Sequence, residues 1–216
     1  MFGFKINPEK IKKKNTKLLK KSGIDVVEHL PWIEITEQRS DVDIARRCIV
    51  LASLLQLHFG APKELIAKYL KDNDLLDSVT SEENRLLQVD HDKLGEQEKT
   101  DLYWVIEAIW ALAWVGGKHD NLTLNTGVES SLAGMLPNFH EEEPAKNFID
   151  SFSSRKQADI FEKLDMFYRA HWFARNNELS GKDSSLVDLS IIMERRKALE
   201  WVSDNHEQWD DISLST

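Results

Sequence analysis

Residues 104–117 read WVIEAIWALAWVGG, and this segment is the strongest indication of the fold class. Apolar side chains fill it around one charge, Glu107, and two glycines end it at positions 116 and 117. The apolar run is too short to cross a bilayer and carries its charge in the middle, which is typical of a helix buried in a core. We therefore predict a core helix from Asp101 to Val115 that ends at the glycine pair.

Cap residues predict helices on both sides of this core helix. Asn7 followed by Pro8 opens the first helix, and Ser40 with Asp43 opens another that ends at Gly60. The predicted helices cover residues 8–22, 40–59, 62–70, a short helix capped by Thr80, 101–115, 144–152, 154–179 capped by Ser154, and 185–202 capped by Ser185.

The remaining segments contain no strand signal. Residues 24–37 are rich in β-branched residues and interrupted by Pro31, so we expect extended chain there and at most a minor hairpin. Residues 118–143 are mostly loop. No run alternates apolar and polar residues for long enough to predict a strand. The sequence therefore predicts an all-α fold, a compact single-domain bundle of about seven to nine helices, with more than half of the residues in helix.

The composition suits one domain with a sizeable core. Of the 216 residues, 41% are hydrophobic, with seven Trp and nine Phe to fill the interior. Cys48 is the single cysteine, which excludes an intrachain disulfide and a cysteine-based metal cluster within this sequence. The first residues, MFGFKINPEKIKKKN, lack the apolar segment of a secretory signal. We expect a cytoplasmic protein without a transmembrane segment.

Charge is distributed unevenly along the chain. Residues 1–21 hold eight Lys and one acid, so they carry +7 of a net charge of −9, and the other residues carry −16. We predict a basic N-terminal arm over residues 1–23 and a helical domain over 24–216. The arm either contacts an anionic partner or is a solvated helix attracted to its own acidic body. Its lysines come without arginine or aromatic residues, so we do not expect nucleic acid as the partner. The candidate anion-contact residues are Lys10, Lys12, Lys13, Lys14, Lys17, Lys20 and Lys21.

Helix faces, read at about 100° per residue, place charges on the inner side of four predicted helices. A buried charge without a partner is costly, so these groups should pair with one another. For Glu107 the geometry favours Arg47 or Arg175, with Arg195 as a third cation. The candidate inner polar cluster comprises Arg47, Glu107, Asp165, Tyr168, Arg175 and Glu194.

Two interpretations of this cluster stay open. In the first, it is an interhelical ion-pair network that fixes helix register, and Asp165 also pairs locally with Arg169. In the second, it is a polar pocket in which a perturbed carboxylate lies near Tyr168 or His171. A dry, fully paired cluster favours the first interpretation, and a solvent-reached pocket lined by its residues favours the second.

No sequence motif indicates a reaction. There is no dinucleotide-binding glycine pattern, no phosphate-binding loop and no nucleophile elbow. No His has a Glu three residues before it, as a di-iron helix bundle would require. Cys48 lies on an apolar stripe and is interpreted as a packing residue. We predict no metal site and no cofactor.

Seven segments together resemble a family known as domain of unknown function family 4272, found mainly in bacteria. The resemblance implies a shared, mainly helical fold and assigns no reaction. Members typically have Arg where this chain has Val105 and an acidic residue near Ser215. The matching segments are HLP at 29–31, RSDVDIARRCIVL at 39–51, SEE at 81–83, WVIEAIWALAWVGG at 104–117, YRAHWFARNNELSG at 168–181, ERRKALEW at 194–201 and WDDISLST at 209–216.

These observations predict a non-enzymatic, intracellular interaction protein, an accessory or protective factor that binds an unknown protein partner. Its acidic body and two-signed surface suit electrostatic docking. One alternative is an enzyme or small-molecule binder that uses the inner cluster of Glu, Asp, Arg and Tyr. Another is contact of the Lys-rich arm with nucleic acid or a membrane surface. The oligomeric state stays open.

Overall fold

The computed structural model describes residues 6–182 and 185–216, and within them the chain is 62% helical and has no strand. The predicted all-α fold is confirmed, and the hairpin allowed for residues 24–37 does not form. The α-helices of the described residues are α1 (Pro8–Lys21), α2 (Asp41–His58), α3 (Lys63–Asp72), α4 (Ser81–Leu86), α5 (Glu96–Val115), α6 (Ala145–Asp150), α7 (Gln157–Leu179) and α8 (Leu189–Ser203).

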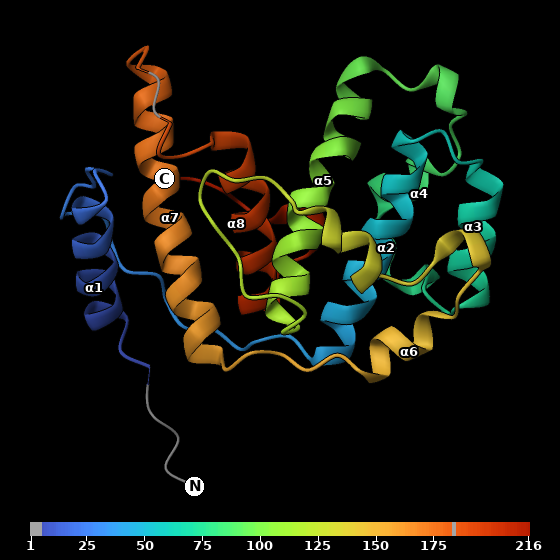
Figure 1. Ribbon diagram of the computed structural model, residues 1–216, viewed down its shortest axis with the longest axis horizontal. Helices are drawn as coiled ribbons and strands as arrows, with labels where there is room; N and C mark the ends of the chain where they lie inside the picture. Colours follow the sequence, from blue (N-terminus) through green and yellow to red (C-terminus); the bar gives the residue numbers. More distant parts are fainter. Residues whose placement is uncertain (1–5, 183–184) are drawn as a thin grey trace, which may run out of the picture.

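Helix α5 lies at the centre of the bundle (Figure 1). It packs against α2 on one side and α8 on the other, α7 packs on α8, and α1 packs on α7. Every residue from Ala108 to Val115 is buried, because neighbouring helices cover both sides of this part of α5. Helices α3 and α6 cover α2, so the packing order along the long axis runs from α1 through α7, α8, α5 and α2 to α3.

The predicted caps explain where three helices begin. The Asn7 side chain accepts a hydrogen bond from the Lys10 amide at 2.9 Å, and Ser40 Oγ accepts one from the Asp43 amide at 3.1 Å. Thr80 opens α4 with a reciprocal capping box. Each arrangement pairs amides of a first turn that have no partner within the helix.

Three predicted helix starts need correction. Helix α5 begins at Glu96 rather than Asp101, because the Glu98 carboxylate accepts a hydrogen bond from the Gly95 amide at 2.7 Å and closes an earlier first turn. Ser154 does not cap α7, which begins after Lys156 without a side-chain cap. Ser185 does not cap α8 either; the Asp188 carboxylate does, by accepting from the Ile191 amide at 3.1 Å.

Helix α1 lies at one end of the molecule beside α7 (Figure 1). The side-chain amide of Asn15 joins the two helices by donating to the Glu162 carbonyl at 2.8 Å. Residues 1–5, which include Lys5 of the predicted arm, lie outside the described residues. The division into an arm over 1–23 and a domain over 24–216 stays a prediction. Among the described residues, no helix has the length and apolarity needed to cross a bilayer.

Candidate functional site

The buried carboxylate of α5 is paired with α8. Arg195 donates to Glu107 Oε2 from Nη2 at 2.6 Å and from Nε at 2.9 Å, and the two residues are 0% and 3% exposed. The guanidinium also donates to the carbonyls of Thr123 at 2.7 Å and Thr126 at 2.9 Å. Burial raises the pKa of Glu107, and the charge of Arg195 opposes that rise. The preferred partners Arg47 and Arg175 were wrong, because α8 supplies the cation from directly beside α5.

The buried carboxylate of α7 is paired within its own helix, as predicted. Arg169 donates to Asp165 from Nε at 3.0 Å and from Nη2 at 2.7 Å. The side-chain amide of Asn15 adds a hydrogen bond to Asp165 at 2.9 Å. Arg169 Nη2 also donates to the Pro31 carbonyl at 3.1 Å, which attaches the segment before α2 to α7.

Tyr168 lies against a cation that the face analysis missed. The guanidinium of Arg196 lies 4.9 Å from the ring centre, and its Nη1 lies 2.8 Å from His171 Nδ1. Arg196 also donates to the carbonyls of Leu214 and Ser215, both at 3.2 Å, so it holds the chain end against α8. Burial, with a further contribution from Arg196, lowers the pKa of His171 to about 4. His171 is therefore a neutral acceptor for Arg196 at physiological pH.

The last two predicted residues have no buried ion-pair partner. Arg175 is exposed and pairs with Glu178 on its own helix, which corrects the expectation that it faces inward. It lies in the last turns of α7, where residues 175–180 are exposed apart from half-buried Asn177. Glu194 is half-buried, and its carboxylate forms no ion pair or hydrogen bond with any residue that the structure describes. Burial raises the pKa of Glu194.

Arg47 occupies a different region from the other five candidates. Its Nη2 donates to Glu83 Oε2 at 2.6 Å, and Glu83 also accepts from the Thr80 amide at 2.8 Å, which caps α4. Burial raises the pKa of Glu83 and lowers the pKa of Arg47. The guanidinium lies 5.2 Å from the ring centre of Trp209, and its buried Nε has no hydrogen-bond partner among the described residues.

A pocket of about 560 Å³ opens beside this pair, and we call it the Arg47 pocket. It is lined by Arg39, Asp43 and Arg47 at and just before the start of α2, residues 77–81, Trp201 at the end of α8, and residues 208–211. Arg39 stacks 4.1 Å from the ring centre of Trp201, and Trp201 meets Trp209 edge to face at 5.7 Å. Two aromatic–guanidinium stacks thus form the walls.

Four carboxylates surround this pocket: those of Asp43, Asp77, Asp210 and Asp211. All four residues are exposed, and none forms an ion pair with a described residue. Asp43 accepts one neutral hydrogen bond, from Ser40 Oγ at 2.7 Å. Two guanidiniums therefore face four carboxylates, which leaves the pocket with a negative excess. In the described part of the chain, no cluster of His, Cys, Asp or Glu has metal-binding geometry.

The face analysis found one residue of this pocket, Arg47, and missed the rest. The structure separates the six candidates, and no ion pair joins any two of them. The sequence did contain a signal for the other pocket residues, because several segments that carry the family resemblance line this pocket. Residues 39–51, 81–83, 194–201 and 209–216 each contribute to the Arg47 pocket, although they are far apart in sequence.

The predicted anion-contact lysines all lie on α1. Six are exposed and Lys12 is half-buried. Lys13 pairs with Glu9, Lys20 pairs with Glu28, and Lys14 reaches Glu162 of α7. The side chains without an ion pair among the described residues are those of Lys10, Lys12, Lys17 and Lys21.

Comparison with known proteins identifies one family. The family model described as Domain of unknown function (DUF4272) matches residues 11–212. No curated protein and no solved structure matches this sequence.

Proposed function

The chain belongs to the DUF4272 family, and we propose that it is a non-enzymatic interaction protein that binds a basic segment of a partner protein at the Arg47 pocket. We place this role, accessory or protective, in the bacterial cytoplasm. The buried free thiol of Cys48, whose pKa burial raises to about 12, is inert and needs no oxidising compartment.

The observation that carries the proposal is the unpaired acidic rim. Asp43, Asp77, Asp210 and Asp211 border one pocket and form no ion pair among the described residues. Arg39 interacts electrostatically with Asp43 and Arg47 with Asp210, and these two cations are outnumbered by the four carboxylates. Like charges held close together repel one another, and a guanidinium or ammonium group from outside would relieve that repulsion. A basic side chain is therefore the natural occupant.

The walls hold the acidic rim in a fixed arrangement. Trp201 and Trp209 are buried residues that border the pocket, and their rings lie against the chain's own cations, Arg39, Arg47 and Lys197. Arg39 is fixed at the entrance by donating to the Trp201 carbonyl at 2.7 Å and to the Glu207 carbonyl. Such fixed side chains lower the ordering cost of binding.

The buried charges support a scaffold role for the interior. Glu107, Asp165 and Arg47 each lie in a charged pair that other elements cover. Charges used in this way fix helix register and leave recognition to the surface. The acidic charge of residues 22–216, which total −16, favours approach of a basic partner.

A titration with acetyl-Gly-Arg-Gly-amide tests the proposal on the full chain. The indole N–H resonances of Trp201 and Trp209 should shift in a saturable way in ¹H–¹⁵N spectra. The double variant Asp77→Asn/Asp211→Asn should weaken this binding by about tenfold, which corresponds to about 1.4 kcal/mol. The matched control Asp25→Asn/Asp92→Asn removes the same charge from exposed residues outside the pocket.

If both double variants weaken peptide binding equally, the effect comes from long-range electrostatic attraction, and the pocket is rejected as the binding site. A photo-crosslinking residue at position 211 then extends the test to the cellular partner. Capture of a basic protein should be suppressed by excess arginine peptide and by Asp77→Asn. Capture that is reduced neither by excess arginine peptide nor by Asp77→Asn would contradict the proposal.

A second candidate function, a small-molecule binder, rests on a separate feature of the same pocket. Arg39, Arg47 and the hydroxyl residues 78, 80 and 81 line the same pocket, and such donors suit a carboxylate. Together with the acidic rim they would accommodate a zwitterion such as a free amino acid. Free arginine and the capped peptide distinguish the two, because only the former carries a carboxylate.

A further inference from the structure

A second recess lies between α1 and the segment that leads to α2. It has a volume of about 460 Å³, within the range of small-molecule sites. It shares no residue with the Arg47 pocket and concerns a separate activity. We call it the α1 groove, and its lining includes Lys12, Lys13, Thr16, Lys17, Lys20 and Trp32.

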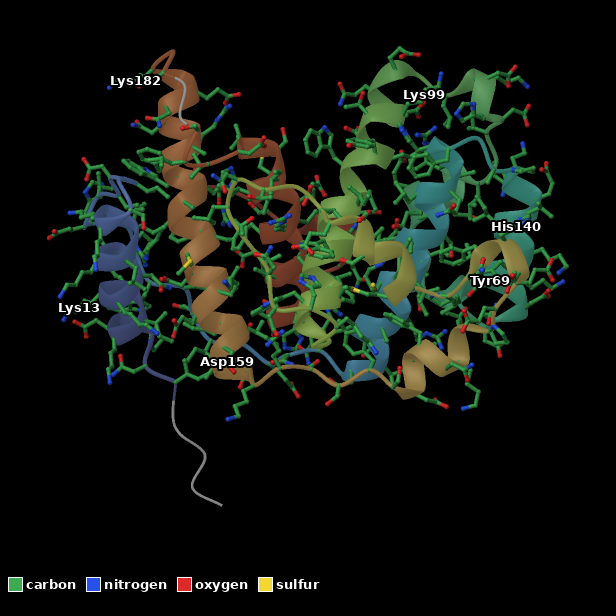
Figure 2. The ribbon with its side chains drawn as sticks, in the orientation of Figure 1. Lys13, Tyr69, Lys99, His140, Asp159 and Lys182 are labelled. Atoms are coloured by element: carbon green, nitrogen blue, oxygen red, sulfur yellow. The ribbon has the colours of Figure 1, made fainter. Side chains whose placement is uncertain are left out.

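The groove has a positive excess. Lys13 pairs with Glu9 at 2.7 Å and Lys20 with Glu28 at 3.0 Å, so two of its lysines are matched by its two acids. Lys12 and Lys17 form no ion pair among the described residues, although Lys12 also interacts electrostatically with Glu9 and Glu28. Figure 2 shows Lys13 on the side of α1 that faces away from α7, so this side is open to an approaching ligand.

Trp32 gives the groove an exposed aromatic surface. It is 52% exposed, whereas the other six tryptophans are buried or half-buried. The backbone before it is attached to α7, because the Pro31 carbonyl accepts a hydrogen bond from buried Arg169. An exposed indole is typical of recognition sites, where its face stacks on an aromatic or apolar partner.

Thr16 supplies an independent sign that the groove is incomplete. The residue is 8% exposed and lines the groove, yet its buried Oγ1 has no hydrogen-bond partner among the described residues. Unpartnered buried hydroxyls are uncommon in folded proteins. An acceptor brought by a ligand would satisfy this donor.

We propose that the α1 groove binds a small organic anion with an aromatic body. Its carboxylate, sulfonate or phosphate group is held by Lys12 and Lys17, and Thr16 Oγ donates to the same group. Its aromatic body stacks on Trp32. The ligand combines the two properties that the lining offers, positive charge and an aromatic face.

The same features favour a compact anion over a polyanion or a membrane. The groove holds two uncompensated lysines, whereas a duplex needs a row of cations to neutralise many phosphates. The net charge of −9 also opposes approach to an extended anionic surface. Nucleic acid and anionic vesicles therefore serve as comparison arms of the test.

The test uses 1-anilinonaphthalene-8-sulfonate, which has an aromatic body and one sulfonate, as the probe with the full chain. Saturable binding is expected from probe fluorescence and from quenching of tryptophan emission, and Trp32→Ala should remove the part of the quenching that arises from Trp32. Lys12→Ala/Lys17→Ala should weaken binding by at least about tenfold, because it removes both charged donors. Trp32→Ala should weaken it as well. Lys10→Ala/Lys21→Ala is the matched control, since it removes the same charge from α1 outside the groove and should change binding less than about twofold.

Three results would overturn the proposal. Equal weakening by both lysine pairs would assign the effect to diffuse attraction, and binding that survives Trp32→Ala unchanged would place the probe elsewhere. In the comparison arms, a 12-base-pair duplex or phosphatidylserine vesicles that bind through Lys12, Lys17 and Trp32, with no displacement by the probe, would assign the groove to that macromolecule. Helical circular dichroism confirms in each variant that α1 is intact.

Discussion

The α5–α8 and α1–α7 interfaces each bury an arginine–carboxylate pair, and they differ in how completely the polar atoms around it are bonded. At α5–α8, Arg195 gives every nitrogen a partner, divided between Glu107 and two loop carbonyls. At α1–α7, the buried atoms Asn15 Oδ1 and Arg169 Nη1 have no partner among the described residues.

The difference indicates which interface is fixed and which can respond to a ligand. A fully bonded network in the centre of a bundle allows one arrangement, since any shift breaks several bonds at once. An interface with unpartnered donors and acceptors loses less when it moves and gains when a water or ligand arrives. The α1 groove lies beside the less completely bonded interface.

Glu107→Gln should produce the largest loss of stability. The change keeps the shape of the side chain and leaves the charge of Arg195 buried without its counter-ion, which typically costs about 3–5 kcal/mol. Urea denaturation followed by circular dichroism measures the loss. Arg195→Met should cost a similar amount, and the double variant should recover part of it.

Glu194→Gln is the matched control for that substitution. Glu194 lies on α8, and burial raises the pKa of its unpaired carboxylate. Loss of this charge should leave the free energy of unfolding at pH 7 within about 0.5 kcal/mol or slightly higher. Arg175→Met should also be neutral, since its ion pair is exposed. Equal losses from Glu107→Gln and Glu194→Gln would contradict the assignment of Arg195 as the partner.

Asp165→Asn should destabilise the protein less than Glu107→Gln, by about 2–3 kcal/mol. The asparagine oxygen can still accept from Arg169 Nε and from Asn15, the bond from Arg169 Nη2 to Oδ1 is lost, and Arg169 keeps its bond to the Pro31 carbonyl. The same urea experiment compares the two interfaces directly. A loss larger than that of Glu107→Gln would invert the comparison.

The α7–α8 contact should make stability depend on pH between 6.5 and about 4. The unfolded His171 binds a proton below its ordinary pKa of 6.5, whereas the folded residue does so only near 4. The unfolded chain therefore binds more protons in this window, and stability present above pH 6.5 is lost as the pH falls. The melting temperature should fall less over this window in His171→Asn than in the unmodified protein. Parallel curves for the two proteins would show that His171 does not contribute.

Thr16→Val should have the smallest effect of the substitutions at the α1–α7 interface. It replaces a buried hydroxyl that has no partner among the described residues by a methyl group of similar size, so the protein should be unchanged or up to about 1 kcal/mol more stable. Thermal denaturation measures the difference. A loss above about 1 kcal/mol would mean that the hydroxyl is bonded in solution.

The helical fold was predictable because its signals are local. Asn7, Ser40 and Thr80 each sit within three residues of the amide that they cap, and the apolar run at 104–117 is continuous. The early start of α5 was missed because Gly95 is a weak cap residue, and the reach of Glu98 back to its amide leaves little trace in apolar periodicity.

The site was predictable only in part because its partners are distant in sequence. The inner position of Glu107 follows from its own helix, whereas Arg195 is 88 residues away and only one residue after Glu194. Glu194 and Arg195 are consecutive on α8, so their side chains point about 100° apart, and an error of that size in the predicted inner face selected Glu194 instead of Arg195. Four separate segments build the Arg47 pocket, and nothing in any one of them shows which segment lies opposite.

The hydrogen bonds from Arg195 to the loop after α5 should affect how easily a protease cuts that loop. Residues 118–129 have no helix, yet Arg195 binds the carbonyls of Thr123 and Thr126, and the Leu124 carbonyl accepts from the Asp188 amide at 3.0 Å. A protease must draw such a segment into an extended form before it can cut, and these bonds oppose that step. Cleavage in this loop should therefore follow opening of the α5–α8 interface, and the cutting rate would report how often the centre of the bundle comes apart.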